Sequence, residues 1–355
     1  MYFIDKRIQV ICDELRRERI RDRSAMGCWS YKKGLFFRPE EADAAAAPFE
    51  HFDCSSMHWY GPDEHYWFRA DLTVPESFAG RSVWMNIRTQ IDEYDDGKNP
   101  QFLLFVDGEV TQGLDMNHRE VRLLERARGG ETFRIDLQAY TGTLYSEFNL
   151  IVELYWLDEE VDGLYYDLQV PLWAFSRMDE DDKTRLDIQT VLNDAVNLLD
   201  LRRPYSAEYY SGVAAARALL EERLYKAMGG HDDVVATCIG HTHIDVAWWW
   251  TVAQTREKVA RSFATVLKLM DEYPEYRFMS SQCVLYDFLR QRYPEVYERV
   301  KARVAEGHWE PEGGMWLESD TNLTSGESLV RQFVHGKRFF KEEFGVDCRI
   351  LWLPD

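Results

Sequence analysis

The chain has 355 residues, which is more than one ordinary domain holds and predicts two or three domains. Its hydrophobic content of 45%, including 14% aromatic residues, can fill several cores and excludes global disorder. The 62 acidic and 42 basic side chains give a net charge of −20. We therefore expect neither nucleic acid nor an anionic membrane as a partner, because both bind through clustered Lys and Arg.

The cysteines and the N-terminal residues both indicate the cellular compartment of the protein. The six cysteines lie far apart and include no CxxC pair, a pattern typical of reduced thiols. The first residues read MYFIDKRIQVICDELRRERI, in which charges interrupt the apolar positions throughout. This predicts an amphipathic helix rather than a secretion signal, and no stretch is apolar enough to span a membrane. We expect a soluble, cytoplasmic protein.

Residues 26–177, after a leading helix in residues 1–25, show the alternation of half-buried strands. From Tyr66 to Val74 every second residue is apolar, and three later runs repeat this period of two. Asp107-Gly108 lies between two apolar runs and predicts a hairpin. Several antiparallel strands at this spacing predict an ancillary β-sandwich of the jelly-roll type.

The apolar period becomes helical from about Met178. Residues 178–230 are expected to form a helical linker of two helices, the first ended by Pro204 and the second covering residues 207–228.

Residues 231–355 alternate between strand and helix patterns. Short strands are expected at 234–239, 277–279, 308–310 and 349–353, with helices at 252–272, 284–305 and 327–344. This order predicts an α/β domain with a parallel sheet or (β/α) barrel. Because so few units cannot close a barrel, we expect the chain to contain only the N-terminal part of this catalytic domain.

The segment after the first of these strands carries a candidate metal site. Active sites of (β/α) barrels lie at the carboxyl ends of their strands. His241, His243 and Asp245 alternate with apolar or small residues there, so their side chains point to the same side of an extended segment. Imidazole and carboxylate together suit Zn²⁺, or Co²⁺ or Mn²⁺. Alternatively, one or both histidines only bond to the backbone in a packed turn.

Two further candidate residues lie just beyond these ligands and at the end of the last expected strand. Trp248 could support a sugar ring, although packing against the following helix is the alternative for the Trp248–Trp250 run. Asp355 follows Pro354 at the last strand end, where it is otherwise an ordinary turn aspartate.

Together these motifs resemble the glycoside hydrolase family 38 α-mannosidases, in their microbial and cytosolic branch. The matching segments are His241-Thr242-His243-Ile244-Asp245-Val246-Ala247-Trp248, Gly314-Met315-Trp316-Leu317-Glu318-Ser319-Asp320, Asn322 to Gln332, and Trp352-Leu353-Pro354-Asp355. They cover about residues 234–355 in the order of the family, and Gln112 to His118 resemble the ancillary β-domain of the same branch more weakly.

The resemblance implies a role for each residue. His243, Asp245 and Asp355 would be zinc ligands, with His241 beside the site rather than in it. Asp355 would also be the nucleophile of a retaining α-mannosidase that hydrolyses terminal α-mannosides of oligosaccharides through a covalent mannosyl-enzyme. Substrate contacts are expected from Trp248, His241, Glu318 and Asp320. The motif of the last two also suits capping of the next helix.

The resemblance also implies what this chain does not contain. The fourth zinc ligand and the acid/base aspartate of the family lie beyond Asp355, so we expect the chain alone to be inactive. A homodimer is compatible with the large ancillary domains. Two other functions stay open at this point: a metal-dependent amidohydrolase, which also places HxH after a first strand, and an inactive sugar-binding fragment.

Overall fold

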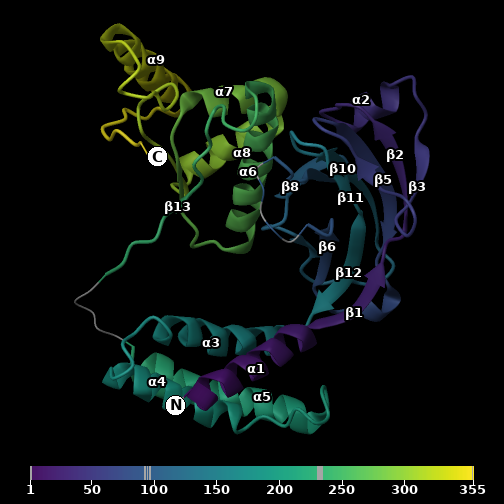
Figure 1. Cartoon of the computed structure of the whole chain (residues 1–355), viewed down its shortest axis with the longest axis vertical. Coiled ribbons are helices and arrows are strands. Elements are labelled where there is room, and N and C mark those ends of the chain that lie inside the picture. The colour runs from purple at the N-terminus through teal and green to yellow at the C-terminus, as the bar shows by residue number, and fades with distance from the viewer. Residues whose placement is uncertain (1, 92, 94, 96, 230–234, 354) are drawn as a thin grey trace.

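The computed structural model describes residues 2–91, 93, 95, 97–229, 235–353 and 355. In Figure 1 the described residues form three groups: a layer of helices, a pair of curved antiparallel sheets, and a group of helices around a short parallel sheet. The third group carries the candidate site, and the other two are described only as far as they position it.

Two antiparallel sheets form the β-rich group. The first has the order β1-β12-β6-β9, with bounds β1 Ile20–Ala25, β12 Ile151–Leu157, β6 Val83–Arg88 and β9 Glu120–Leu124. The second has the order β3-β2-β5-β10-β7-β8, with bounds β3 Glu50–Asp53, β2 Cys28–Lys33, β5 His65–Thr73, β10 Thr132–Tyr140, β7 Gln101–Val106 and β8 Glu109–Leu114. Smaller elements complete the group: α2 Pro39–Ala44, β4 Trp59–Tyr60, the 3₁₀ turn η1 Glu76–Phe78 and β11 Glu147–Phe148.

The period-two pattern explains how these sheets pack. Phe68 and Leu72 of β5 are buried in a core that also contains Met85 of β6 and Leu154 of β12, so the two sheets share one core. The predicted hairpin is confirmed: β7 and β8 pair antiparallel around Asp107-Gly108, and both turn residues have positive φ, as a two-residue hairpin turn requires. The finer assignment to a jelly roll stays a prediction.

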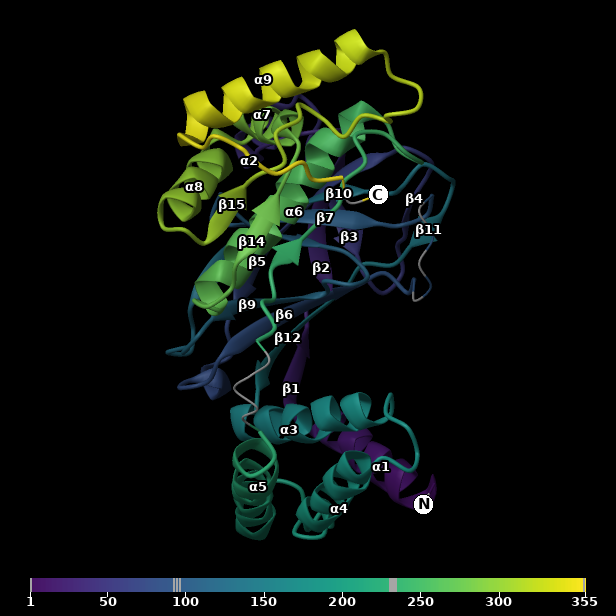
Figure 2. The same cartoon turned by 90° about the vertical axis from the view of Figure 1, so that its left-hand side faces the viewer.

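The helical layer combines segments that precede and follow the β-rich group in the sequence. It consists of α1 Tyr2–Glu18, α3 Glu159–Phe175, α4 Lys183–Val196 and α5 Ala207–Leu220, with the π-helical turn η2 Glu221–Lys226. These helices share one buried core and lie together at one end of the molecule in Figure 2. The helices expected in residues 178–230 are thus present, and the leading helix packs against them.

Two elements of this part were not expected. Residues 159–175, inside the range assigned to the sandwich, form helix α3. Gly163 and Pro171 interrupt its sequence, although Asp158 caps its first turn and Pro171 is accommodated within it. In addition, residues 20–25, inside the range assigned to the leading helix, form β1, which pairs with β12.

The third group has the predicted alternation of strands and helices. Strands β13 Gly240–His241, β14 Phe278–Ser280 and β15 Trp309–Pro311 form a parallel sheet in that order. The helices are α6 Val252–Glu272, α7 Cys283–Arg292, α8 Pro294–Ala305 and α9 Gly326–Phe344. The assignment of this sheet to an incomplete (β/α) barrel stays a prediction.

Three details of this group correct the expectation. Of the strand expected at 234–239, residue 234 lies outside the described residues, and residues 235–239 are exposed and pair with none of the described strands. The helix expected at 284–305 is two helices, since Pro294 has no N–H to continue α7. The strand expected at 349–353 is a single parallel bridge from Leu351 to Gly313.

The β-rich group and the third group contact each other through α6, which lies beside β8 in Figure 1. Gly113 of β8 makes this approach possible, because its N–H donates to Thr265 Oγ1 at 3.2 Å and a Cβ there would lie 2.6 Å from the Arg261 carbonyl oxygen. On the same side, Trp67 and Phe105 join the core beneath α6.

Gly113→Ala is therefore expected to lower the free energy of unfolding by about 1–3 kcal/mol through overpacking. The measurement is chemical denaturation of the variant beside Gly27→Ala, whose added Cβ would meet nothing within 4 Å. Equal stability of the two variants would contradict the close docking of β8 on α6.

In the part of the chain that the structure describes, no helix combines the length and apolar character needed to cross a membrane.

Candidate metal centre

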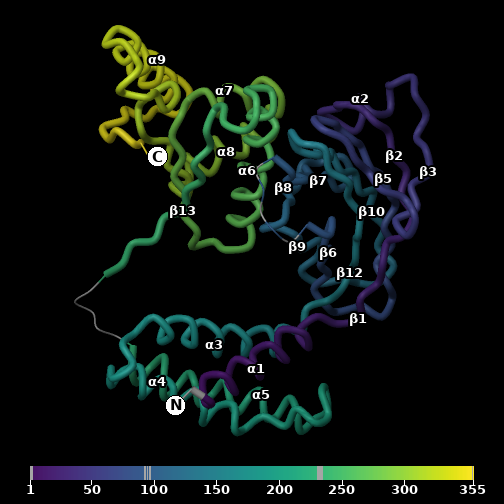
Figure 3. The backbone as a smooth tube through the Cα atoms, in the orientation of Figure 1, coloured from purple at the N-terminus to yellow at the C-terminus, as the bar shows by residue number. Residues whose placement is uncertain are grey.

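The structure brings together the three residues expected to bind a metal. His243 and Asp245 follow β13, and Asp355 ends the segment that returns from α9 toward the sheet (Figure 3). One ligand atom from each residue lies within 4.8 Å of the others. The side chains of His243 and Asp245 are 28% and 34% exposed, so the cluster is open to solvent on one side.

Local sequence explains how the first two side chains converge. Ile244, between them, is buried in the core of the third group. Because successive residues of an extended segment point to opposite sides, burying Ile244 turns His243 and Asp245 together toward the open end of the sheet. The expected same-side arrangement is thus present.

Glu318 brings a third carboxylate next to the cluster. Its Oε2 lies 2.9 Å from His243 Nε2, and its Oε1 accepts a hydrogen bond from Ser281 Oγ at 3.1 Å. Burial raises the pKa of Glu318 above its ordinary value, and the neighbouring imidazole partly opposes this. Glu318 therefore contacts a candidate ligand, and the substrate contact expected from it stays a prediction.

His241 is occupied on both ring nitrogens. Nδ1 lies 2.9 Å from the Met279 carbonyl oxygen, and Nε2 accepts from the Trp352 indole N–H at 3.2 Å. Since a carbonyl only accepts and an indole only donates, this arrangement requires a neutral ring protonated on Nδ1. Neither nitrogen faces the His243–Asp245–Asp355 cluster as a free ligand, which agrees with a place beside the site.

The three consecutive tryptophans separate into two kinds. Trp248 and Trp249 are each 64% exposed. Trp250 donates its indole N–H to the Asp245 carbonyl oxygen at 3.1 Å, and the Lys258 ammonium lies 4.0 Å from its ring centroid. Trp250 is thus the packed member, and Trp248 is left accessible three residues beyond Asp245.

Asp320 is engaged in a turn. Its Oδ1 accepts from the backbone N–H groups of Asn322 and Leu323 at 2.7 and 3.0 Å, shortly before Ser325 caps the start of α9. The capping alternative for this motif is therefore present in the structure, and the substrate contact expected from Asp320 stays a prediction.

Sequence reasoning assigned no role to Ser281 or Gln282. Both are buried directly after β14, and both bond to residues of the site. The only signal was their position as polar residues at a strand end, which indicates the site but not the role.

The donor set fits a divalent transition metal. Imidazole nitrogen and carboxylate oxygen are both ligand types that zinc accepts, and catalytic zinc sites commonly have three protein ligands and one open position. Three neutral or anionic donors lie together here, and among the residues that the structure describes no Lys or Arg forms an ion pair with them. Such a donor set is what a cation would require. Metal binding itself stays a prediction.

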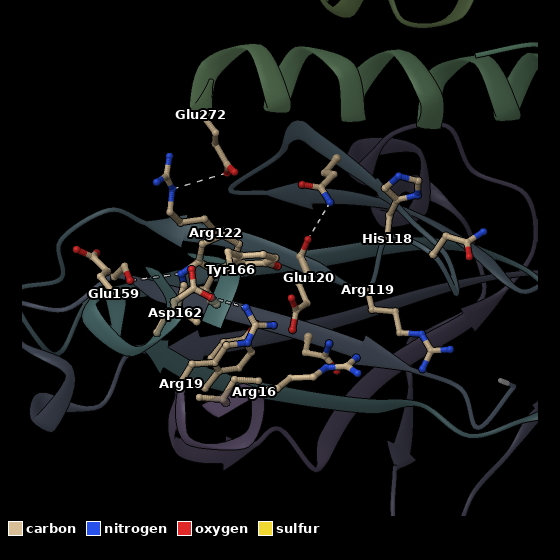
Figure 4. A pocket seen from close by; sticks show the side chains of 18 of the residues that line it. Arg16, Arg19, His118, Arg119, Glu120, Arg122, Glu159, Asp162, Tyr166 and Glu272 are labelled. Atoms are coloured by element: carbon tan, nitrogen blue, oxygen red, sulfur yellow. Dashed lines mark hydrogen bonds and ion pairs between the residues drawn. The ribbon is translucent and has the colours of Figure 1, made fainter. Parts of the chain in front are cut away.

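A separate cavity of about 1180 Å³ lies between α1, β6, β9 and α6 (Figure 4). Arginines are prominent in its lining, but several have acidic partners. Arg19 pairs with Asp162, and Arg122 Nε lies 3.7 Å from Glu272. The cavity includes none of the candidate site residues, so we place the chemistry at the cluster around His243.

Comparison with known proteins supports the same placement. Residues 233–355 match the family model described as the glycosyl hydrolases family 38 N-terminal domain. α-Mannosidase G of Dictyostelium discoideum is 29% identical over 334 residues, which are 87% of this chain and 29% of that protein. Human α-mannosidase 2C1 is 32% identical over 308 residues, 81% of this chain and 28% of that protein.

An α-mannosidase of Saccharomyces cerevisiae is 33% identical over 215 residues, 57% of this chain and 19% of that protein. The chain thus spans less than a third of the length of these relatives. The first two alignments cover most of the chain, so the similarity is not confined to residues 233–355. The resemblance carried by the motifs is confirmed: residues 233–355 match the family 38 model, and proteins named α-mannosidases align with most of the chain.

Proposed function

We propose that this chain carries the metal-binding and nucleophile half of a retaining α-mannosidase that acts on terminal α-mannosides of oligosaccharides. The observation that carries the proposal is the convergence of His243, Asp245 and Asp355 within 4.8 Å. The relatives, all named α-mannosidases, support the substrate class.

His243 would hold the metal through an imidazole nitrogen, and Asp245 and Asp355 through carboxylate oxygens. Zn²⁺ suits this mixed set of donors, and Co²⁺ or Mn²⁺ could replace it. When bound, the ion supplies Lewis-acid charge that orients the cis 2- and 3-hydroxyls of a mannoside. Glu318, whose Oε2 lies 2.9 Å from His243 Nε2, would contact the imidazole beside the ion.

Asp355 would perform the covalent step. One carboxylate oxygen forms a bond to the anomeric carbon while the bond from that carbon to the leaving oxygen breaks, and water later cleaves the ester. A second carboxyl group ~5 Å away must protonate the leaving oxygen in such an enzyme, and we assign that role to no residue of this chain. The exposed Trp248 would support the apolar face of the sugar.

Specificity for mannose is the first test. The full-length protein is expected to hydrolyse 4-nitrophenyl α-D-mannoside with kcat/KM ~10⁴-fold above that for the α-D-glucoside, because a site that grips a hydroxyl rejects the isomer that misplaces it. Proton NMR should show the α-anomer as the first sugar released. Similar kcat/KM for the two glycosides, or a β-anomer released first, would contradict the proposal.

The amidohydrolase alternative loses support from the structure, because His241 uses both ring nitrogens on Met279 and Trp352 and leaves no HxH pair for a metal. We also propose a cytoplasmic location, supported by six free cysteines. The homodimer and the sugar-binding fragment stay predictions.

A further inference from the structure

Gln282 occupies an unusual position directly after β14. Its side chain is buried, with 2% of the residue exposed, and its backbone has φ of 64°. This left-handed conformation favours glycine and is energetically costly for a residue with a side chain. A glutamine there therefore suggests that its amide contributes something that glycine cannot.

The amide of Gln282 bridges the two loops that form the candidate metal centre. Nε2 donates to the Ile244 carbonyl oxygen at 2.9 Å, which lies in the chain between His243 and Asp245. Oε1 accepts from the backbone N–H of Glu318 at 3.3 Å. One rigid, planar group thus fixes the loop of the two ligands relative to the loop of Glu318.

These contacts close a ring of interactions around His243. Gln282 holds the carbonyl group next to His243 in the chain, and it also holds the backbone of Glu318, whose Oε2 lies 2.9 Å from His243 Nε2. Ser281 holds the other oxygen of the same carboxylate. The orientation of the imidazole therefore depends on the distance that the Gln282 amide spans.

The backbone of this turn is anchored without the Gln282 side chain. The N–H of Cys283 donates to the Met315 carbonyl at 3.4 Å, and the N–H of Val284 donates to that of Trp316 at 2.9 Å. Replacing the amide should consequently loosen the relation between the two loops while α7 stays docked.

We infer that Gln282 is a positioning residue that keeps His243 and Asp245 in register with Glu318 and so sets metal affinity and turnover. This inference rests on the proposed function, because it assumes that the cluster binds a metal.

The test is a titration of full-length wild-type, Gln282→Met and Gln282→Glu proteins with Co²⁺. The visible absorption spectrum is measured at each Co²⁺ concentration. Methionine removes both hydrogen bonds at similar length, whereas glutamate keeps the acceptor for the Glu318 N–H and loses the donor to Ile244. We expect the Co²⁺ dissociation constant to rise 10–100-fold in Gln282→Met and less in Gln282→Glu. The Co²⁺ absorption bands should change, and kcat should fall more than KM changes.

Gln138→Met is the matched control. Gln138 is equally buried, at 2% exposed, and its Nε2 donates to the Phe36 carbonyl oxygen at 2.6 Å away from the site. The Gln138→Met variant should lose about as much thermal stability as Gln282→Met while keeping the wild-type Co²⁺ dissociation constant and spectrum.

Wild-type affinity and spectrum in folded Gln282→Met would overturn the inference, as would the same loss of affinity in Gln138→Met. If Gln282→Met does not fold, Gln282→Glu decides by the same criteria. A wild-type protein that binds no divalent ion would instead overturn the proposed function, and the inference with it.

Discussion

Asp355→Asn in the full-length protein is expected to lower kcat on aryl α-mannosides by about 10⁴–10⁶-fold, the range seen when enzymes lose a nucleophile or its partners. The amide keeps the shape of the carboxylate but cannot form the glycosyl ester, and one negative ligand of the cluster is lost. Steady-state rates measure the loss. Asp347→Asn is the control, since Asp347 is exposed and pairs with Lys337; its rate should stay near wild type.

Azide separates a lost nucleophile from a collapsed site. In Asp355→Gly, azide can attack the anomeric carbon of an activated aryl α-mannoside from the side that the carboxylate vacates, expelling the phenolate and forming β-mannosyl azide. Appearance of that product supports the assignment. Asp355→Asn with more than a tenth of the wild-type kcat would contradict it.

Asp245→Ala and His241→Ala should differ strongly in metal binding. Asp245 is a member of the three-residue cluster, so its loss removes a charged ligand, whereas both nitrogens of His241 bond to Met279 and Trp352. We expect dialysed Asp245→Ala to contain almost no zinc. His241→Ala should keep most of its zinc, with an affinity lowered ~10–100-fold through displacement of its neighbours.

Elemental analysis of the two variants, at equal protein concentration and after the same dialysis, decides this prediction. Full zinc occupancy in Asp245→Ala would contradict the ligand assignment. Equal loss from both variants would show that His241 is a ligand after all.

Sequence reasoning succeeded where a local pattern determines the structure. Helix α6 has the predicted bounds because its apolar period is regular and Thr251 with Gln254 forms a capping box at its start. The same-side placement of His243 and Asp245 follows from the alternation of an extended segment. Helix α3 escaped prediction because Gly163 and Pro171, which usually mark loops, lie inside it.

The rest depends on contacts between distant segments. Asp355 reaches the cluster through a segment that contacts the parallel sheet and its loops through the Leu351–Gly313 bridge and the Trp352–His241 hydrogen bond, and no spacing in the sequence indicates these contacts. The amide of Gln282 likewise spans loops that are 38 and 36 residues away along the chain. Local patterns thus indicated the candidate site, whereas the hydrogen bonds around it could be seen only in the tertiary structure.

Covalent trapping tests the central claim most directly. A 5-fluoro glycosyl fluoride of the manno configuration should react with the full-length protein, lose fluoride and leave a slowly hydrolysed ester, because the second fluorine disfavours the oxocarbenium-like transition state. Tryptic cleavage after Arg349 and mass spectrometry should place one fluoromannosyl group on Asp355. A label on a different carboxylate, or turnover with no labelled peptide at any time, would contradict the claim that this chain supplies the nucleophile.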